Sequence, residues 1–271
     1  MSGAIRPKKH LGQHFLREGS FPGRIVESAC IFPGDAVIEI GPGRGVLTDH
    51  LIRSPAAHIV AVEIDPVLAE LLKSRYREEK KIQIHQGDFL KWPWEVFLSD
   101  HGRSRIVGNL PYNLTTPILF RILEYRSFIK SFTVTVQKEV GERLVSRPGC
   151  KQYGIPSVFF QTYADVRMLF NIPPAAFQPS PNVDSSVVHG TFREKPVHPI
   201  NNDPFFWLMT KRIFGQRRKM IRNTLKGMVG DEVLKHPFPV ALSERPEMLD
   251  PTTLIRLSNE LWLRHQEDLH G

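Results

Sequence analysis

The sequence has few cysteines and no long hydrophobic run. Cys30 and Cys150 are its only cysteines, too few for a disulfide framework and without the spacing of metal ligands. No segment reaches the roughly 18 apolar residues that a membrane-spanning helix needs. The longest uncharged stretch, 168–183, contains four prolines, which a membrane helix would not hold. The N-terminus lacks the apolar core of a secretory signal. These absences predict a reduced, cytoplasmic protein with no membrane segment and no metal.

An excess of basic residues stands out from an otherwise ordinary globular composition. Of the 271 residues, 41% are hydrophobic and 24% are charged. Both values are close to the averages for folded proteins, so the chain can bury a sizeable core. Lysine and arginine number 36 against 28 acidic residues, which gives a formal charge of +8. A net positive charge of this size indicates a negatively charged binding partner, and nucleic acid is the first candidate.

Short apolar runs alternate with helical patterns along the first part of the chain. Alternation of this kind builds βαβ units and a mostly parallel sheet, so we expect an α/β fold. Strands are predicted at 35–40, 59–62, 82–85, 105–108, 132–137, 165–172 and 185–192, the last two as an antiparallel pair at the sheet edge. Helices are predicted at 46–53, from Pro66, and at 138–146, 207–214, 219–228 and 251–264. Because only helical patterns follow residue 192, a domain boundary is expected at about residues 193–203.

A glycine cluster, Gly41-Pro-Gly-Arg-Gly45, follows the first of these strands. Glycines let the backbone lie against a ligand, but this spacing differs from the dinucleotide fingerprint. Glu63 and Asp88 end the next two strands, at the sheet edge where ligands bind. The Glu63 carboxylate can accept hydrogen bonds from both hydroxyls of a ribose, and the Asp88 carboxylate can accept one from an adenine amine. With no phosphate-binding lysine in the loop, the pattern favours S-adenosylmethionine; an ordinary tight turn and solvated strand-end charges are the alternatives.

The fourth strand ends in the tetrapeptide Asn109-Leu-Pro-Tyr112. Pro111 holds Leu110 extended, so the Leu110 carbonyl and the Asn109 side chain can offer two acceptors to an NH₂ group. Tyr112 supplies a face on which a base can stack. The tetrapeptide therefore predicts an amino-methyltransferase that acts on a nucleic-acid base, with a turn of no function as the alternative.

The order of these motifs resembles that of the ribosomal RNA adenine N6-dimethyltransferases. The matching stretches are 12–16 (GQHFL), 39–43 (EIGPG), 63–65 (EID), 87–88 (GD), 109–112 (NLPY), 176–185 (AFQPSPNVDS) and 214–225 (FGQRRKMIRNTL). The resemblance extends from residue 9 to about residue 260 and is strongest to the bacterial members that act on small-subunit rRNA. It implies a Rossmann-like methyltransferase fold with a seven-stranded, mostly parallel sheet over 1–195 and a small all-α RNA-recognition domain over 203–271.

The resemblance also implies an activity and a site. The expected reaction transfers methyl groups from S-adenosylmethionine to N6 of two adjacent adenosines in the 3′-terminal hairpin of 16S rRNA, in the immature 30S subunit. The basic N-terminal arm, 1–24, would be a lid over the cofactor. The implied cofactor-binding residues are Gln13, His14, Leu16, Gly41, Gly43, Glu63, Ile64, Asp88, Phe89 and Asn109. The implied catalytic residues are Asn109, Leu110, Pro111, Tyr112 and Phe177, the last facing Tyr112 across the flipped base.

Residues 211–226 include seven basic residues and no acid. Apolar residues lie between them, which predicts one helix with a buried face and a cationic face. A charge run is most often a solvated face, but seven like charges repel one another unless a polyanion is present. We therefore expect the rRNA backbone to bind at Arg217, Arg218, Lys219 and Arg222.

Two other functions remain open on the sequence. The antibiotic-resistance relatives that methylate one adenosine of large-subunit rRNA resemble this chain up to about Val183 but differ in their last helices. A non-catalytic RNA-binding or assembly factor that kept the fold is the second alternative, and the intact Asn109, Tyr112, Glu63 and Asp88 count against it. Nothing in the sequence requires more than a monomer.

Overall fold

The structure is a computed structural model that describes residues 12–94, 97, 101–230 and 232–270. Three basic residues of the expected arm, Arg6, Lys8 and Lys9, lie outside this range. The strands are β1 (Phe15–Leu16), β2 (Ala36–Ile40), β3 (His58–Glu63), β4 (Ile82–Gln86), β5 (Ser104–Asn109), β6 (Ile129–Gln137), β7 (Ala164–Ile172), β8 (Phe177–Gln178) and β9 (Ser185–Phe192). The helices are α1 (Ser20–Ser28), α2 (Val46–Arg53), α3 (Pro66–Arg75), α5 (Thr115–Glu124), α6 (Lys138–Val145), α7 (Ile155–Tyr163), α8 (Asp203–Gly215), α9 (Ile221–Leu225) and α10 (Pro251–His270).

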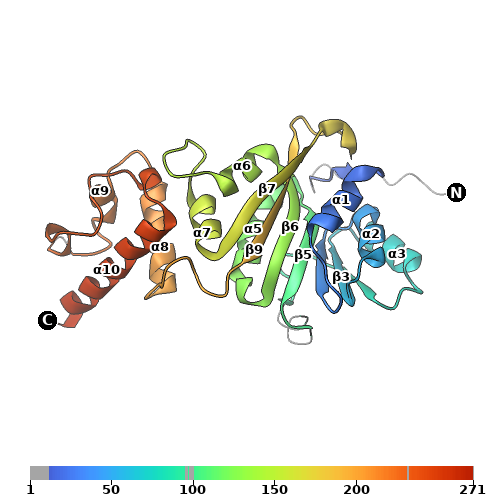
Figure 1. Cartoon of the computed structure of the whole chain (residues 1–271), viewed down its shortest axis with the longest axis horizontal. Coiled ribbons are helices and arrows are strands. Elements are labelled where there is room, and N and C mark those ends of the chain that lie inside the picture. The colour runs from blue at the N-terminus through green and yellow to red at the C-terminus, as the bar shows by residue number, and fades with distance from the viewer. Residues whose placement is uncertain (1–11, 95–96, 98–100, 231, 271) are drawn as a thin grey trace. The chain divides into compact units, whose positions relative to one another are not determined.

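Seven strands form one sheet in the order β4-β3-β2-β5-β6-β9-β7 (Figure 1). Strand β2 pairs in parallel with β3 and with β5, β4 is parallel to β3, and β6 is parallel to β5. Strand β9 runs antiparallel to β6, which leaves β7 at the sheet edge. The predicted Rossmann-like fold with a seven-stranded, mostly parallel sheet is confirmed.

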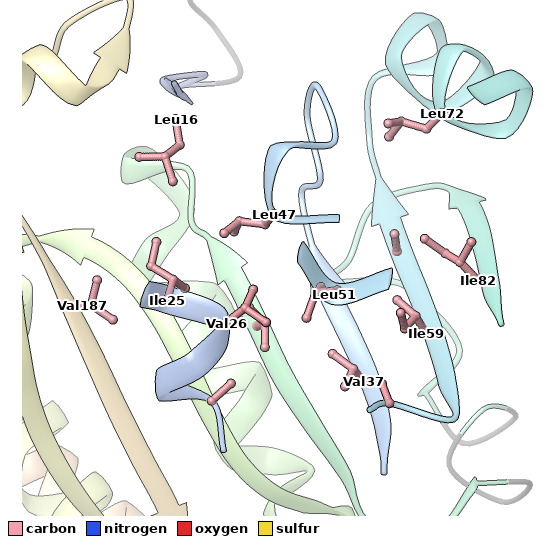
Figure 2. Packing of buried hydrophobic residues seen from close by; sticks show 14 of the residues in the cluster. Leu16, Ile25, Val26, Val37, Leu47, Leu51, Ile59, Leu72, Ile82 and Val187 are labelled. Atoms are coloured by element: carbon pink, nitrogen blue, oxygen red, sulfur yellow. The ribbon is translucent and has the colours of Figure 1, made fainter. Parts of the chain in front are cut away.

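A hydrophobic core fills the space between the first three helices and one face of the sheet (Figure 2). Ile25 of α1 and Leu51 of α2 are fully buried there, against Val37 of β2 and Ile59 of β3. Burying one such side chain contributes about 1.5–3 kcal/mol. Every residue of β2 is buried, as expected for a central parallel strand that is covered on both faces. This packing fixes the carboxyl ends of β2 and β3, where the glycine cluster and Glu63 lie.

The loops at these strand ends have local causes in the sequence. Asp65 caps α3, since its side chain accepts a hydrogen bond from the Val67 N–H at 3.0 Å, and Pro66 occupies the first helical position, where proline is tolerated. Gly45 precedes α2 with φ of +85°. A Cβ at Gly45 would also lie 2.5 Å from the Tyr76 hydroxyl, so only glycine fits there.

The chain divides into two compact units. The first comprises Met1–Gly141 and Val166–Phe192, and the second comprises Glu142–Asp165 and Arg193–Gly271. The change of unit after Phe192 adjoins the boundary expected at about residues 193–203. The inclusion of Glu142–Asp165 in the second unit was not anticipated from the sequence. Helix α7 explains it, because its Phe159 ring stacks on Trp207 of α8 with centroids 4.0 Å apart. The assignment of a catalytic domain and an RNA-recognition domain stays a prediction.

The structure corrects two expectations about local elements. Helix α1 takes in residues 20–24 of the expected basic arm, because Pro22, Ile25 and Val26 of this helix are buried. The single basic helix over 211–226 is wrong: α8 ends at Gly215 and α9 begins only at Ile221. The Arg212 side chain donates to the Thr224 carbonyl at 2.8 Å and to the Lys226 carbonyl at 2.7 Å, which holds α9 folded back beside α8.

The described ranges contain neither a membrane-spanning helix nor a metal-binding cluster. No helix in them is both long enough and apolar enough to cross a membrane. They also contain no group of three or more histidine, cysteine, aspartate or glutamate side chains placed to hold a metal ion.

Candidate functional site

A pocket lies where β2, β3 and β5 end, in the first unit. Parallel strands place their carboxyl ends at one edge of the sheet, so loops far apart in the sequence meet there. The pocket is lined by Gly12, Gln13, His14, Phe15, Gly41, Gly43, Glu63, Ile64, Asn109, Leu110 and Pro111. All of these except Gly12 and Phe15 are site residues that the sequence predicted.

Glu63 holds the glycine cluster in place. The side chain is 3% exposed, and its two oxygens accept from the Gly43 N–H and the Asp65 N–H, each at 2.9 Å. Burial raises the pKa of Glu63, and these backbone hydrogen bonds partly offset that effect. A carboxylate has about four acceptor positions, so both oxygens can accept one hydrogen bond more. That capacity fits the two hydroxyls of a ribose.

The glycine cluster leaves room on one side and is covered on the other. Gly41 has φ of +62°, and a Cβ there would meet no atom within 4 Å. At Gly43 a Cβ would lie 2.9 Å from the Phe15 ring, so the N-terminal segment packs directly on the loop. Phe15 was not predicted as a site residue; the available signal was its place within the matching stretch 12–16 (GQHFL).

A buried acid, Glu39, lies beneath this loop and was not predicted to matter. Its side chain is fully buried; Oε2 accepts from the Thr48 hydroxyl at 2.8 Å, and Oε1 has no hydrogen-bond partner among the described residues. Burial raises the pKa of Glu39 to about 8, against the lowering effect of the Thr48 hydrogen bond and with added repulsion from Glu63 and Asp49. Glu39 therefore holds its proton at neutral pH.

Replacing this acid should change how stability depends on pH. The folded chain keeps the proton of Glu39 up to about pH 8, whereas an unfolded chain loses it near pH 4.5. Stability therefore falls as pH rises between these values, by up to about 1.4 kcal/mol per unit. Glu39→Gln stays neutral and should remove this decline. Urea unfolding at about pH 5.5 and pH 8 measures the loss of stability between these values, with Glu70→Gln on the exposed face of α3 as the control. An equal loss of stability in Glu39→Gln and in the wild type would contradict this prediction.

Asn109 ends β5 and touches the N-terminal segment. Its Nδ2 donates to the His14 carbonyl oxygen at 2.8 Å. Its Oδ1 is buried and accepts no hydrogen bond from any residue that the structure describes. The Leu110 N–H donates to the Thr135 carbonyl at 3.0 Å, which fixes the start of the following turn. The pocket thus contains an unused acceptor at the position where the sequence predicted one.

Tyr112 follows this turn, and its ring is held at both ends. The hydroxyl forms a 2.5 Å hydrogen bond with the Ser185 hydroxyl. Burial raises the pKa of Tyr112, although the Ser185 hydrogen bond lowers it somewhat, so the hydroxyl is neutral. The His14 ring stacks on Tyr112 with centroids 5.0 Å apart, and His14 Nδ1 lies 2.8 Å from the Pro179 carbonyl oxygen. Ser185 ends one of the motifs quoted above but was not predicted as a site residue.

The remaining predicted residues of the first unit, Tyr112 included, do not line the pocket. Strand β1 pairs with β8, with Leu16 opposite Phe177, and both side chains belong to the hydrophobic core. Phe177 is fully buried, and its expected place opposite Tyr112 across a flipped base stays a prediction. Phe89 is buried edge-on against Trp94. Asp88 is half-buried after β4, where it accepts from the Leu90 N–H at 2.9 Å.

The four basic residues predicted to bind RNA lie in the second unit and separate into two kinds. The Arg217 guanidinium donates to the Lys151 carbonyl at 2.8 Å and to the Cys150 carbonyl at 3.1 Å. Arg217 therefore holds the loop before α7 in place. The other three, Arg218, Lys219 and Arg222, are exposed.

The sequence of the chain is similar to those of known proteins over nearly its whole length. The profile of the ribosomal RNA adenine dimethylase family matches residues 5–266. The ribosomal RNA small subunit methyltransferase A of Pseudomonas aeruginosa is 38% identical over 256 residues, which cover 94% of this chain and 95% of that protein. The protein of the same name from Chlorobaculum tepidum is 39% identical over 267 residues, 98% of this chain and 94% of that protein.

Two solved structures share the fold over nearly the whole chain. The 23S rRNA methyltransferase ErmE superposes with a TM-score of 0.68 at 25% identity, over 91% of this chain and 99% of that one. A dimethyladenosine transferase from Plasmodium falciparum superposes with a TM-score of 0.75 at 22% identity, over 90% of this chain and 96% of that one.

Proposed function

The chain belongs to the ribosomal RNA adenine dimethylase family, and on that premise we propose that it dimethylates N6 of two adjacent adenosines in the 3′-terminal hairpin of 16S rRNA. The predicted family, enzyme class and cofactor are confirmed: the protein is an S-adenosylmethionine-dependent rRNA adenine dimethyltransferase. Its substrate would be the immature 30S subunit in the cytoplasm, because its relatives are named for the small subunit. We also propose that it acts as a monomer, since nothing in the sequence requires a second copy.

The unused Oδ1 of Asn109 is the observation that carries the proposal. A buried acceptor without a partner costs about 1–3 kcal/mol, so a fold that retains one is suited to a ligand that donates there. This acceptor shares its pocket with Gly41 and Glu63. A donor group and a ribose-bearing ligand can therefore meet in one place.

The residues present fit S-adenosylmethionine, which when bound supplies a methyl group made electrophilic by a sulfonium. Glu63 would accept from the ribose hydroxyls, and Gly41 leaves the space in which the backbone can approach the ligand. Ile64, which is exposed next to Glu63, would offer an apolar face to the purine. Asp88 remains a proposed acceptor for the purine amine, although it does not line the pocket.

On the substrate side, the pocket would hold an extruded adenine. A stacked base cannot present N6 to the cofactor, so it must leave the helix. Asn109 Oδ1 and the Leu110 carbonyl would accept the two N6 hydrogens and favour a tetrahedral nitrogen with its lone pair free. Tyr112 would stack on the ring, which contributes about 1–3 kcal/mol per base. Among the residues that the structure describes, the pocket lining contains no serine, cysteine or lysine, so direct displacement is proposed, with the N6 proton leaving to solvent.

Methyl transfer to ribosomal subunits tests the proposal. Purified protein would be incubated with tritium-labelled S-adenosylmethionine and immature 30S particles that lack the modification, and with 50S particles in parallel. We expect label in 16S rRNA, mapping as dimethyladenosine at two adjacent positions. Label in 23S rRNA would indicate the large-subunit activity instead. Normal cofactor and rRNA binding with no label in either RNA would indicate a non-catalytic factor.

Glu63→Ala should weaken the binding of S-adenosylmethionine tenfold to a hundredfold. The estimate follows from the loss of hydrogen bonds to a charged group, worth about 1.5–3 kcal/mol. Calorimetric titration measures it, with Glu63→Gln as a milder variant that keeps one acceptor oxygen for the ribose. Glu70→Ala on α3 is the control for removing one acid from this unit. Unchanged affinity in Glu63→Ala would remove the ribose assignment.

A further inference from the structure

The contact between His14 and Asn109 involves the main chain of His14, not its ring. A carbonyl oxygen only accepts hydrogen bonds, whereas an amide side chain has one accepting end and one donating end. The nitrogen of Asn109 must therefore face the His14 carbonyl, 2.8 Å away. Its oxygen is left as the end that can accept from a substrate.

The position of this carbonyl is fixed by the segment around it. We call residues 12–17 the N-terminal strap. Within the strap, Phe15 pairs with Gln178, and the Arg17 N–H donates to the Ala176 carbonyl at 2.8 Å. The Phe15 ring is 8% exposed and lies on Gly43. The strap is thus seated on the glycine cluster and on β8 at once.

We infer that the strap orients the side chain of Asn109, and that the His14 carbonyl is the positioning group. The inference rests on the proposed function of Asn109 as the acceptor for N6. It adds that position 109 must donate as well as accept. The same strap lines the cofactor pocket through Gly12, Gln13 and His14. The Oδ1 atom of Asn109 is therefore oriented to accept from the substrate only when the strap lies over that pocket.

Asn109→Asp tests whether residue 109 must donate a hydrogen bond as well as accept one, because the side chain of this variant can donate only when it is protonated. The carboxylate form accepts at both ends, so it repels the lone pairs of the His14 carbonyl. The protonated form has an O–H that donates to this carbonyl and a second oxygen that accepts, as the amide does. Burial and the nearby Glu63 would keep the pKa of the introduced carboxyl above the usual aspartate value of about 3.9.

Among the described residues, three other ionisable groups lie near this position. His14 and Glu63 line the same pocket, and Tyr112 stacks on His14. All three are present in the wild type, so a titration that only the variant shows belongs to residue 109. Thr116→Asp, which adds the same charge at an exposed position of α5, is the control.

The experiment measures kcat from about pH 5.5 to pH 8 at saturating cofactor, each value divided by that of the wild type at the same pH. Asn109→Asp should be at least a hundredfold slower than wild type at pH 8 and recover at least tenfold as the pH falls. Thr116→Asp should give a flat ratio. Hydrogen exchange at the Arg17 amide gives a second readout: relative to wild type, its protection in Asn109→Asp should fall as the pH rises.

The outcomes separate the inference from the proposed function. If the kcat of Asn109→Asp stays close to that of the wild type at every pH, the inference is overturned, because an acceptor alone would then suffice at position 109. A flat, low ratio with unchanged protection at Arg17 would also overturn it, because the strap would not sense residue 109. Near-normal kcat in Asn109→Ala would instead remove Asn109 from the proposed reaction.

Discussion

Asn109→Ala should lower kcat by a hundredfold or more, which corresponds to about 3 kcal/mol on the activation barrier. The N6 lone pair of adenine is delocalised into the ring, so the amine is a poor nucleophile. An acceptor at Oδ1 favours the tetrahedral nitrogen of the transition state more than the planar nitrogen of the ground state, and only such differential binding raises kcat. The variant also loses the orientation of the reacting nitrogen.

Single-turnover methylation of immature 30S particles at saturating cofactor measures this effect. Affinity for the cofactor should fall only slightly, because Glu63 and the glycine cluster are untouched, and rRNA binding should persist. Thr116→Ala, at an exposed position of α5, is the matched control. Turnover near that of the wild type in Asn109→Ala would exclude direct displacement assisted by this side chain.

The seven strands of the large sheet could be predicted because their apolar runs are short and end in polar or glycine residues. Helix α7 could not be predicted, because its polar residues Ser157 and Thr162 are buried together with its apolar ones and mark no exposed face. A short apolar run such as 158–160 does not distinguish a helix from a buried strand. Helix α5 was not predicted either, although Ile118, Leu119, Ile122 and Leu123 recur at helical spacing.

The same contrast divides the candidate site. Gly41, Glu63 and Asn109 could be placed together because each follows a parallel strand, and a parallel sheet brings such positions to one edge. The contacts of the strap depend on pairing between residues far apart in sequence. Phe15 meets Gln178, and no local pattern encodes this register.

Long-range contacts also determine the surroundings of two predicted site residues. The ring of Phe177 enters the core because its strand, β8, pairs with β1. The guanidinium of Arg217 is bound to carbonyls of a loop more than sixty residues away. Sequence motifs identified both residues, but only the tertiary fold determines what each side chain contacts.

The exposed cations Arg218, Lys219 and Arg222 should account for much of the salt-dependent affinity for rRNA. Each phosphate contact releases counterions, so log K falls with log salt by about 0.9 per contact on duplex and about 0.7 on single strands. Replacing all three with Ala should lower affinity on the order of a hundredfold near 0.1 M salt and reduce the salt slope by about 3. Cofactor binding should be unaffected, because none of the three lines the pocket.

Arg217→Ala provides the comparison, because its guanidinium is committed to the Cys150 and Lys151 carbonyls and lies 3.8 Å from the Glu247 carboxylate. This variant should lower the stability of the second unit while changing the salt slope by much less than 1. Binding to 16S rRNA measured from about 0.05 to 0.3 M salt, together with urea unfolding of each variant, separates the two roles. An unchanged salt slope in the triple variant would show that these three cations form a solvated surface that does not contact rRNA. A salt slope reduced by about 1 in Arg217→Ala would show that Arg217 does contact an rRNA phosphate.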